Sequence, residues 1–347
     1  MIENRKIVRR EMLEAMAGAS LAVAGCTSSP ARPDVGAAPR EAGTSARAEP
    51  QGLSDPGGPA APADPVTGQA PRRKLGKTGA EVDAVSLGGE GVLRTTGRSA
   101  EAVPVILEAL RLGVRYCDTA PAYQQSQDYY GEAFRAAGPE ARKRVFLASK
   151  THFRDRDSAL RLLDDSLRRL STDHLDLWQL HDLRTREDLD AIFGKGGAIE
   201  AVVQAKADGR VRFVGITGHH DPAILVEAMG RHPIDTVLCA LNPADPRRLP
   251  FLQTVVPEAR RRGMGIIGMK VMAAGRLLQD RAASAEELIR YGASFADTCI
   301  IGCSSIQEVR DNVAAGRRMQ PMAAEERLAL EARIAPRASR YDTFKMG

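Results

Sequence analysis

Short apolar runs alternate with longer stretches of helical periodicity from about residue 72 onward. The runs are rich in β-branched residues and five to seven residues long, which is typical of strands buried on both faces of a parallel sheet. We predict eight strands, at residues 82–88, 114–118, 145–150, 175–181, 211–217, 235–241, 264–270 and 298–302.

The stretches between these runs carry the signals that begin helices. A leucine repeat over 160–170 falls on one helical face, and Asp157 or Ser158 is its expected N-cap. Asp221 precedes a proline, a pair that caps a helix and forms its first turn. The sequence Ser-Ile-Gln-Glu at 305–308 matches a capping box, so we expect another helix to begin there.

Eight strand–helix units within roughly 250 residues match a (β/α)8 TIM barrel in number and size. The alternative is a doubly wound open sheet, which would need a G-x-G-x-x-G turn after the first strand. The segment "SLGGEGVLRT" does not supply that turn. We therefore predict a barrel domain over 72–320, followed by a C-terminal helix and tail over 321–347.

Residues 1–26 have a different character. The pair Arg9 and Arg10 precedes an uncharged run at 15–25 that is too short to span a bilayer, so we predict a signal peptide. The paired arginines resemble a twin-arginine export signal, and "VAGC" resembles a lipobox in which Cys26 is acylated. We expect an exported lipoprotein whose membrane contact is the lipid on Cys26, or a cytoplasmic protein if the signal is not used.

Residues 27–71 form a Pro/Ala/Gly-rich segment that contains nine of the chain's 20 prolines and no aromatic residue. Such a composition cannot bury enough apolar surface to offset the entropy of ordering, so we predict a disordered linker.

Net charge and cysteine spacing exclude several function classes. The charge is +5, but the densest basic cluster, "EARRRGMG", stands at a predicted helix end without aromatic residues, so we predict no nucleic-acid partner. The adjacent His219 and His220 lack a carboxylate at metal-ligand spacing, so we predict no metal site. No C-x-x-C motif occurs, and we expect buried free thiols at Cys117, Cys239, Cys299 and Cys303.

Ionisable residues stand at the ends of three consecutive predicted strands. Asp118 ends the second strand, Lys150 the third and His181 the fourth, and Tyr123 lies in the loop after the second. In a TIM barrel these strand ends meet at the face that carries the active site. Each residue alone fits a structural role, but their joint placement predicts a site. We expect Lys150, facing this rim, to lie outside the core.

Five segments carry a family resemblance: "DTAPAY", "LASK", "LDLWQLHD", "GRVRFVGIT" and "IIGCSSIQEVRDNVAA". Over residues 72–316 the chain resembles the aldo/keto reductase superfamily. The resemblance implies reduction of an aldehyde or ketone, a small-molecule substrate, by NADPH. Tyr123 would be the general acid and Lys150 would lower its pKa. Asp118 would keep the lysine charged, and His181 would hydrogen-bond the carbonyl oxygen.

The same resemblance implies NADP(H) rather than NAD(H) as cofactor. At the adenosine phosphate end it points to Gly302, Cys303, Ser304 and Asn312. Glu308 stands where many relatives have a basic or an amide side chain, and its negative charge disfavours a 2′-phosphate. We expect Glu308 to act mainly as the acid of the capping box.

Elsewhere in the cofactor site the resemblance is less regular. The positions that it implies are Gly88, Gly89, Thr217, Gly218 and Lys270. Gly218 and Leu238 replace the amides that relatives use at the carboxamide, and Lys270 either reaches the pyrophosphate or is a solvated strand end. These departures leave a second hypothesis open, a nicotinamide-binding sensor or scaffold with little turnover. The tail at 325–347 has no cysteine, so we predict no iron–sulfur cluster.

Overall fold

The computed structural model describes residues 72–345. The predicted signal peptide (1–26), with Cys26, and the predicted linker (27–71) lie outside the described residues. The contacts of the chain divide it into two units, 1–61 and 62–347, and every described residue belongs to the second. Between residues 72 and 345 no helix is both long and apolar enough to cross a membrane.

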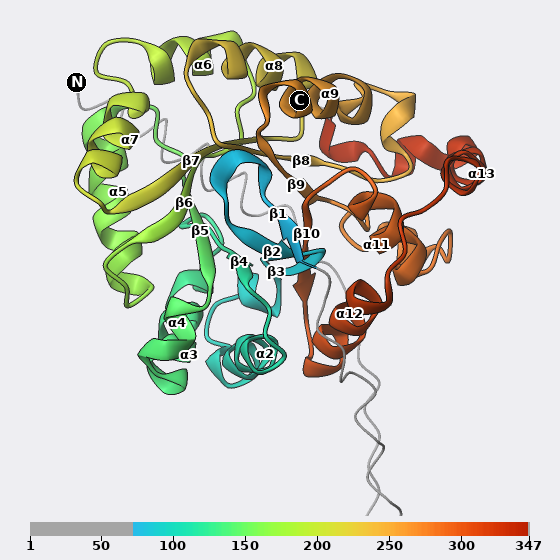
Figure 1. Cartoon of the computed structure of the whole chain (residues 1–347), viewed down its shortest axis with the longest axis horizontal. Helices are drawn as coiled ribbons and strands as arrows, with labels where there is room; N and C mark the ends of the chain where they lie inside the picture. Colours follow the sequence, from blue (N-terminus) through green and yellow to red (C-terminus); the bar gives the residue numbers. More distant parts are fainter. Residues whose placement is uncertain (1–71, 346–347) are drawn as a thin grey trace, which may run out of the picture. The chain divides into compact units, whose positions relative to one another are not determined.

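Within the described residues, eight parallel strands close into a barrel in the order β10-β3-β4-β5-β6-β7-β8-β9 (Figure 1). The predicted TIM barrel is confirmed, and each predicted strand matches an observed one to within about three residues at either end. The strands are β3 Val85–Gly91, β4 Tyr116–Asp118, β5 Phe146–Thr151, β6 Leu175–Leu180, β7 Val211–Gly218, β8 Thr236–Ala240, β9 Gly265–Met269 and β10 Thr298–Cys303.

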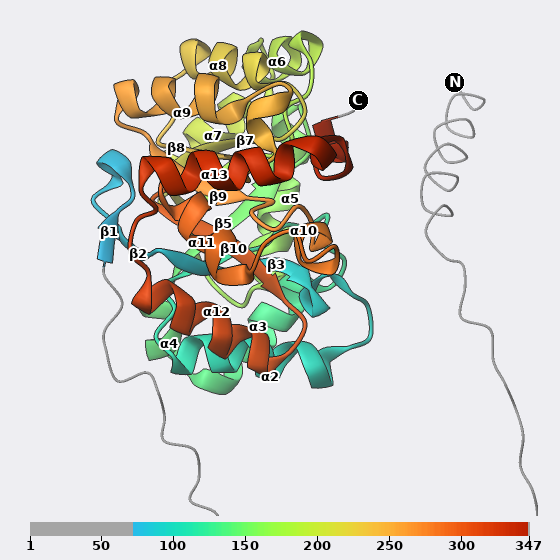
Figure 2. The ribbon, with the colours of Figure 1, turned by 90° about the vertical axis from the view of Figure 1, so that its right-hand side faces the viewer.

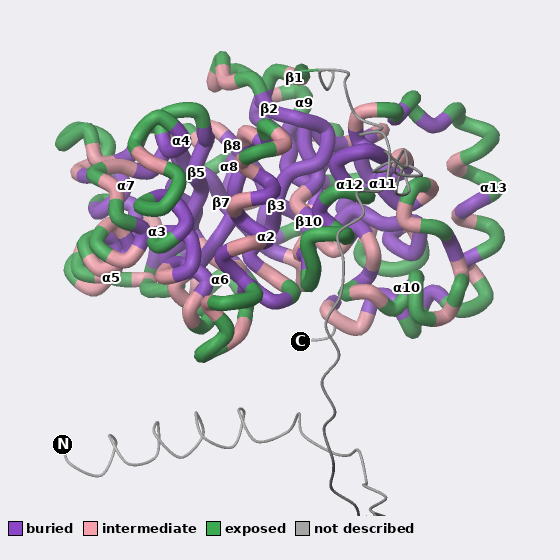
Figure 3. Tube along the Cα trace, turned by 90° about the horizontal axis from the view of Figure 1, so that it is seen from below, coloured by how far each residue is buried: buried purple, intermediate pink, exposed green. Residues whose placement is uncertain are grey.

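Helices surround the strands, and Figure 3 shows the strands buried while the outer faces of the helices are exposed. The α-helices are α2 Ser99–Arg111, α3 Ser126–Ala137, α4 Pro139–Lys143, α5 Arg156–Arg169, α6 Arg186–Phe193, α7 Ala198–Ala207, α8 Pro222–Arg231, α9 Phe251–Arg262, α10 Arg276–Gln279, α11 Ala285–Ala293, α12 Ile306–Arg318 and α13 Ala324–Ile334. Short 3-10 helices are η1 Gly76–Thr78, η2 Val92–Arg94, η3 Asp245–Arg247, η4 Ala335–Arg340 and η5 Thr343–Lys345.

The predicted cap of α8 is observed, whereas that of α5 is not. Asp221 caps α8 by accepting a hydrogen bond from the backbone N–H of Ala223 (2.8 Å). The expected cap of α5 at Asp157 or Ser158 is wrong. Asp155 adopts the extended backbone of an N-cap, and its carboxylate accepts from the N–H of Ser158 (2.8 Å), so the helix begins earlier.

An antiparallel hairpin precedes the barrel and lies across one of its ends (Figure 1). It consists of β1 Arg72–Lys74 and β2 Glu81–Asp83, and Ala84 separates it from β3. The predicted strand at 82–88 merged the end of β2 with β3, because only Ala84 separates the two strands in sequence. Leu75 and Val82 are buried against the interior residues Tyr116, Phe146, Ala148, Leu177, Leu238 and Ile267, so the hairpin closes the N-terminal end of the barrel.

The alternation of side chains along each strand decides which residues point into the barrel between this apolar layer and the C-terminal ends of the strands. Tyr116 on β4 points into the barrel, so Asp118, two residues later, does as well. Ala148 and Lys150 on β5 have the same relation. The register pairs Asp118 with Ala148 and Lys150 with Gln179. The polar residues therefore form the topmost interior layer, at the C-terminal ends of the strands.

The last described residues return to this same end of the barrel. Helix α13 packs beside α11, where the Tyr291 hydroxyl donates to Glu331 (2.6 Å) (Figure 2). Beyond it, the ammonium group of Lys345 donates to the carboxylate of Asp245 (2.6 Å), and both side chains are fully buried. The backbone around Phe344 is thereby fixed against the loops after β7 and β8.

Candidate active site

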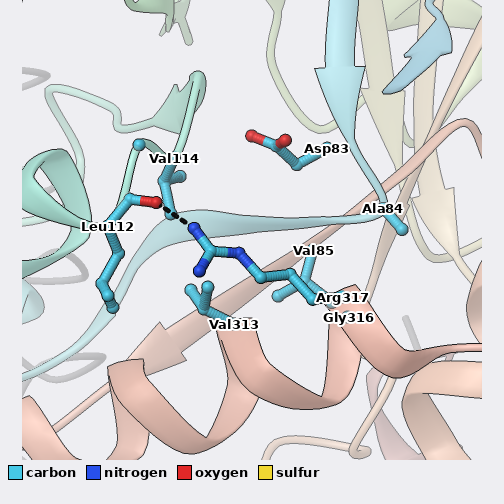
Figure 4. A pocket seen from close by; sticks show the side chains of 9 residues that line it. Asp83, Ala84, Val85, Leu112, Val114, Val313, Gly316 and Arg317 are labelled. Atoms are coloured by element: carbon cyan, nitrogen blue, oxygen red, sulfur yellow. Dashed lines mark hydrogen bonds between the residues drawn. The ribbon is translucent and has the colours of Figure 1, made fainter. Parts of the chain in front are cut away.

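Among the cavities within the described residues, two differ greatly in size. The smaller, of about 20 Å³, lies between β3 and α12, where Arg317 donates to the carbonyl of Leu112 (Figure 4). It has room for about one water molecule. The larger is a cleft of about 1160 Å³ at the C-terminal ends of the strands. It exceeds the usual range for small-ligand pockets, so it can hold a dinucleotide and a small substrate together.

All predicted site residues except Gly218 and Cys303 line this cleft. The barrel thus brings together the residues that the sequence places at the ends of β4, β5, β6, β7, β9 and β10. The four buried cysteines of the described chain are free thiols, as predicted.

Asp118 and Lys150 form an ion pair in which both side chains are completely buried. The lysine ammonium also donates to the carbonyl of Thr119 (2.9 Å), and the amide of Gln179 donates to the other carboxylate oxygen of Asp118 (3.1 Å). The expectation that Lys150 lies outside the core is therefore wrong, because its side chain points inward beneath the rim. Burial opposes a charged lysine, but Asp118 and Tyr123 raise the pKa of Lys150 above its ordinary value.

Tyr123 lies directly above this ion pair. The Lys150 ammonium is 4.8 Å from the centroid of the Tyr123 ring, the Arg94 guanidinium is 5.1 Å from it, and the His181 ring meets it edge-on at 5.9 Å. A Cβ atom at Gly89 would lie 2.8 Å from this ring, so the tyrosine needs a glycine there. The predicted lowering of the Tyr123 pKa does not hold: burial raises the pKa, although Lys150 acts to lower it.

His181 follows β6, and its backbone N–H donates to the carbonyl of Thr151 (2.9 Å). Burial, followed by the positive charge of Lys150, lowers the pKa of His181 well below its ordinary value. The imidazole is therefore neutral near pH 7, with one ring N–H available to donate a hydrogen bond into the cleft.

One wall of the cleft is bare backbone. A Cβ atom at Gly88 would lie 3.3 Å from the backbone nitrogen of Gly302, and a Cβ at Gly302 would lie 2.6 Å from the Cβ of Glu90. Gly88 and Gly302 have no room for a side chain and both line the cleft, so a ligand there can approach the main chain at these two positions. This shape fits a dinucleotide phosphate, which binds backbone N–H groups at a helix start.

The start of α12 forms the end of this wall. Glu308 accepts a hydrogen bond from the N–H of Ser304 (2.8 Å), and its own N–H donates to the Ser305 hydroxyl (3.1 Å). The expected capping role of Glu308 is thus observed, displaced by one residue. Asn312 donates to the thiol of Cys303 (3.5 Å), which is buried and turned away from the cleft.

At the opposite end of the cleft, Thr217 accepts a hydrogen bond from the backbone N–H of Asp182 (2.8 Å). Gly218 does not line the cleft, since a Cβ there would lie 3.1 Å from Leu225 in the helix layer. Lys270 does line it. Its backbone is left-handed (φ 55°), and its ammonium is 3.9 Å from the Glu90 carboxylate.

The prediction missed several residues of the site. Gln179 could have been found, because it lies two residues after the inward-pointing Leu177 on the same strand. Glu90, near the end of β3, and Arg94, in η2, form an ion pair (2.9 Å) and both line the cleft. No sequence signal marks them. The same holds for the segment that borders the cleft at Met272, Ala274, Gly275, Leu278 and Gln279.

The family model described as "Aldo/keto reductase family" matches residues 85–288, which is more than half of the chain. This chain belongs to the aldo/keto reductase family. The match includes the strands that carry Asp118, Lys150 and His181, and it supports oxidoreductase activity on carbonyl compounds.

Named relatives agree with this aldo/keto reductase assignment. L-galactose dehydrogenase of Arabidopsis thaliana is 25% identical over 296 residues, which cover 73% of this chain and 90% of the plant protein. A 6-dehydroglucose reductase of Novosphingobium aromaticivorans is 29% identical over 42% of this chain and 50% of that protein. The aldo-keto reductase AKR11C1 of Bacillus halodurans, in its holo form, has a similar structure. The TM-score is 0.64 at 25% identity, with coverage of 76% of this chain and 96% of that one.

Proposed function

We propose that this protein reduces an aldehyde or ketone to an alcohol by hydride transfer from a nicotinamide cofactor, with Tyr123 as the general acid. The observation that carries the proposal is the stack of Asp118, Lys150 and Tyr123 beneath a cleft large enough for a dinucleotide. When bound, a reduced nicotinamide supplies the hydride.

Each residue of the stack has a distinct part in the proposed reaction. Burial keeps the Tyr123 hydroxyl protonated in the resting protein, so it can give its proton to the carbonyl oxygen. The ammonium of Lys150 stabilises the phenolate that remains, and Asp118 keeps that ammonium charged and in position. The neutral His181 imidazole donates a hydrogen bond to the same oxygen and orients the substrate.

The substitution Tyr123→Phe tests this assignment. We expect loss of 10²- to 10⁴-fold in the rate of NADPH or NADH oxidation with aldehydes, with little change in stability. Tyr130→Phe is the matched control, because the Tyr130 hydroxyl is buried on α3 outside the cleft. The aldehyde panel should include sugars and hydroxyaldehydes, since the names of two relatives refer to sugar substrates.

Two results would contradict the proposal. Full activity in Tyr123→Phe would remove the tyrosine from the chemistry. Nucleotide binding without turnover of any carbonyl would instead favour a sensor or scaffold.

The preference between the two nicotinamide cofactors follows from the adenosine end of the cleft. We propose that NADP(H) is used, as the family resemblance implies, and that Glu308 reduces its advantage over NAD(H). The Glu308 carboxylate already accepts a hydrogen bond from the N–H of Ser304, and Asp311 lines the same end of the cleft. Two negative charges there disfavour a 2′-phosphate.

We also propose that the protein is exported and anchored by acylation at Cys26. Support comes from the paired arginines and the "VAGC" segment of the N-terminal sequence. Cell fractionation with mass spectrometry of the N-terminus tests this, with Cys26→Ser as the control. A soluble cytoplasmic protein that still begins at Met1 would overturn the proposal.

A further inference from the structure

Three side chains that the proposed reaction does not use meet at the rim of the cleft. Asp182 follows β6, and His219 and His220 follow β7. The register pairs Leu180 with Ile216, which brings the two segments after these strands side by side. One carboxylate oxygen of Asp182, Oδ1, is 3.4 Å from Nε2 of each histidine. The three atoms lie within 4.8 Å of one another.

Two of the three converging atoms, Oδ1 of Asp182 and Nε2 of His220, lack hydrogen-bond partners within residues 72–345. Among the described residues, Oδ1 of Asp182 and both ring nitrogens of His220 are buried without a hydrogen bond. Their contacts of 3.4 Å are longer than charge-assisted hydrogen bonds, which are typically 2.7–2.9 Å. Buried polar atoms in folded proteins nearly always have a hydrogen-bond partner. A cluster of buried polar atoms without one therefore indicates a site for a water, an ion or a ligand.

Outer partners orient two of the three side chains. The backbone carbonyl of Phe344 is 3.3 Å from Nδ1 of His219 and can accept a hydrogen bond from an Nδ1–H group. In that tautomer the lone pair is on Nε2, which faces Asp182. The Arg184 side chain donates to the other carboxylate oxygen of Asp182 (2.8 Å), so Oδ1 stays free. Metal-binding histidines and carboxylates are commonly fixed by such second partners.

The spacing of the atoms also suits a metal ion. Zinc binds histidine nitrogen and carboxylate oxygen at about 2.0–2.2 Å, so tetrahedral ligands stand about 3.3–3.6 Å apart. The two 3.4 Å distances from Asp182 fall in that range. Two imidazoles with one carboxylate form the ligand set of zinc sites that keep a coordination position open.

We propose that Asp182, His219 and His220 bind one divalent transition-metal ion, for which zinc is the best match. Asp182 and His219 line the cleft, so the ion presents its free coordination position to a ligand in the cleft. We predicted no metal site because no carboxylate stands at metal-ligand spacing from the two histidines in sequence; Asp221, which follows them, caps α8. The barrel supplies the carboxylate from the neighbouring strand. The proposal concerns binding alone and does not depend on the proposed reductase function.

The test uses the untagged full-length chain after dialysis against a chelator. Zn²⁺ is titrated by calorimetry, and Co²⁺ is titrated by its visible absorption, which reports the coordination geometry. We expect one ion per chain, and at least tenfold weaker binding in His220→Ala and in Asp182→Asn. His174→Ala is the matched control, because His174 forms an exposed pair with Asp173 outside the cleft and should bind normally.

Thermal unfolding gives a second readout that is independent of activity. Zn²⁺ should raise the melting temperature of the wild-type chain and of His174→Ala, and should leave that of His220→Ala unchanged. If His220→Ala does not fold without metal, His219→Gln replaces it in both measurements. The proposal is overturned if the wild-type chain does not bind Zn²⁺, or if the substitutions at Asp182, His219 and His220 leave its affinity unchanged.

Discussion

Replacing Lys150 with methionine would leave a carboxylate buried in the barrel without its cation. Both side chains of the Asp118–Lys150 pair are fully buried. In the variant, the remaining side-chain donors to Asp118 are the Gln179 amide at 3.1 Å and the Tyr116 hydroxyl at 3.5 Å. Methionine fills most of the volume of the lysine, so the main change is electrostatic.

The size of the effect follows from two independent estimates. Removing one partner of a buried ion pair typically costs about 3–5 kcal/mol. Asp118 can escape the unpaired charge by taking up a proton, because burial already raises its pKa and Lys150 opposes that rise. Protonating an acid whose unfolded pKa is about 3.9 costs about 4 kcal/mol at pH 7, at about 1.36 kcal/mol per pH unit. This value is a ceiling on the part of the loss that comes from the unpaired charge at pH 7.

The sign of the pH dependence distinguishes a lost charge partner from lost packing. In the variant, burial should raise the folded pKa of Asp118 without opposition from Lys150, so stability should fall as the pH rises between the unfolded and the folded pKa. Relative to the wild-type chain, Lys150→Met should therefore regain about 2.7 kcal/mol between pH 7 and pH 5. The double variant Asp118→Asn/Lys150→Met carries no buried charge at this pair and should show no such difference.

Urea unfolding at pH 5 and pH 7 measures these differences. The single tryptophan of the chain, Trp178, is buried in β6 and reports barrel unfolding by fluorescence. A loss in Lys150→Met that is the same at both pH values would refute the reasoning, since it would arise from packing. A loss below about 1 kcal/mol at pH 7 would also refute it.

Three further predictions concern other parts of the barrel. Glu308→Gln should strengthen NADPH binding about tenfold, on the order of 1.4 kcal/mol, and leave NADH binding unchanged in a fluorescence titration; equal changes for both cofactors would argue against a charge effect. Asp155→Ala should lower the free energy of unfolding by about 1 kcal/mol through loss of the α5 cap, while Asp157→Ala costs less than half as much. A hydrogen bond from Arg111 lowers the pKa of Glu108 to about 2, with desolvation opposing. The free energy of unfolding of the wild-type chain should therefore fall as the pH falls from 4.5 toward 2, and Glu108→Gln should reduce that fall. The same pH dependence in both proteins would contradict this.

Local patterns in the sequence predict most of the fold. Parallel strands buried on both faces give unbroken apolar runs, and each run between 82 and 302 corresponds to a strand of the barrel. The hairpin of β1 and β2 was missed for a different reason. Its strands have three residues each and are largely charged, and only the bend at Ala84 separates β2 from β3, so no apolar run marks the hairpin.

The candidate site could be predicted where strand periodicity decides the direction of a side chain. Asp118 and Lys150 follow from their positions at strand ends. The burial of Lys150 does not follow, because it depends on how far the loops rise above the strand ends. The approach of Asp182 to His219 depends on the register between β6 and β7, which a single sequence does not contain.

The ion pair between Lys345 and Asp245 has a consequence for how the protein is made. Asp245 lies in the loop after β8, and its partner is added 100 residues later in synthesis. Lys345 also donates to the backbone carbonyls of Arg248 (2.6 Å) and Leu249 (3.1 Å), so that loop has no complete set of contacts until then. The loop after β8 therefore reaches its final packing only once residue 345 has emerged from the ribosome.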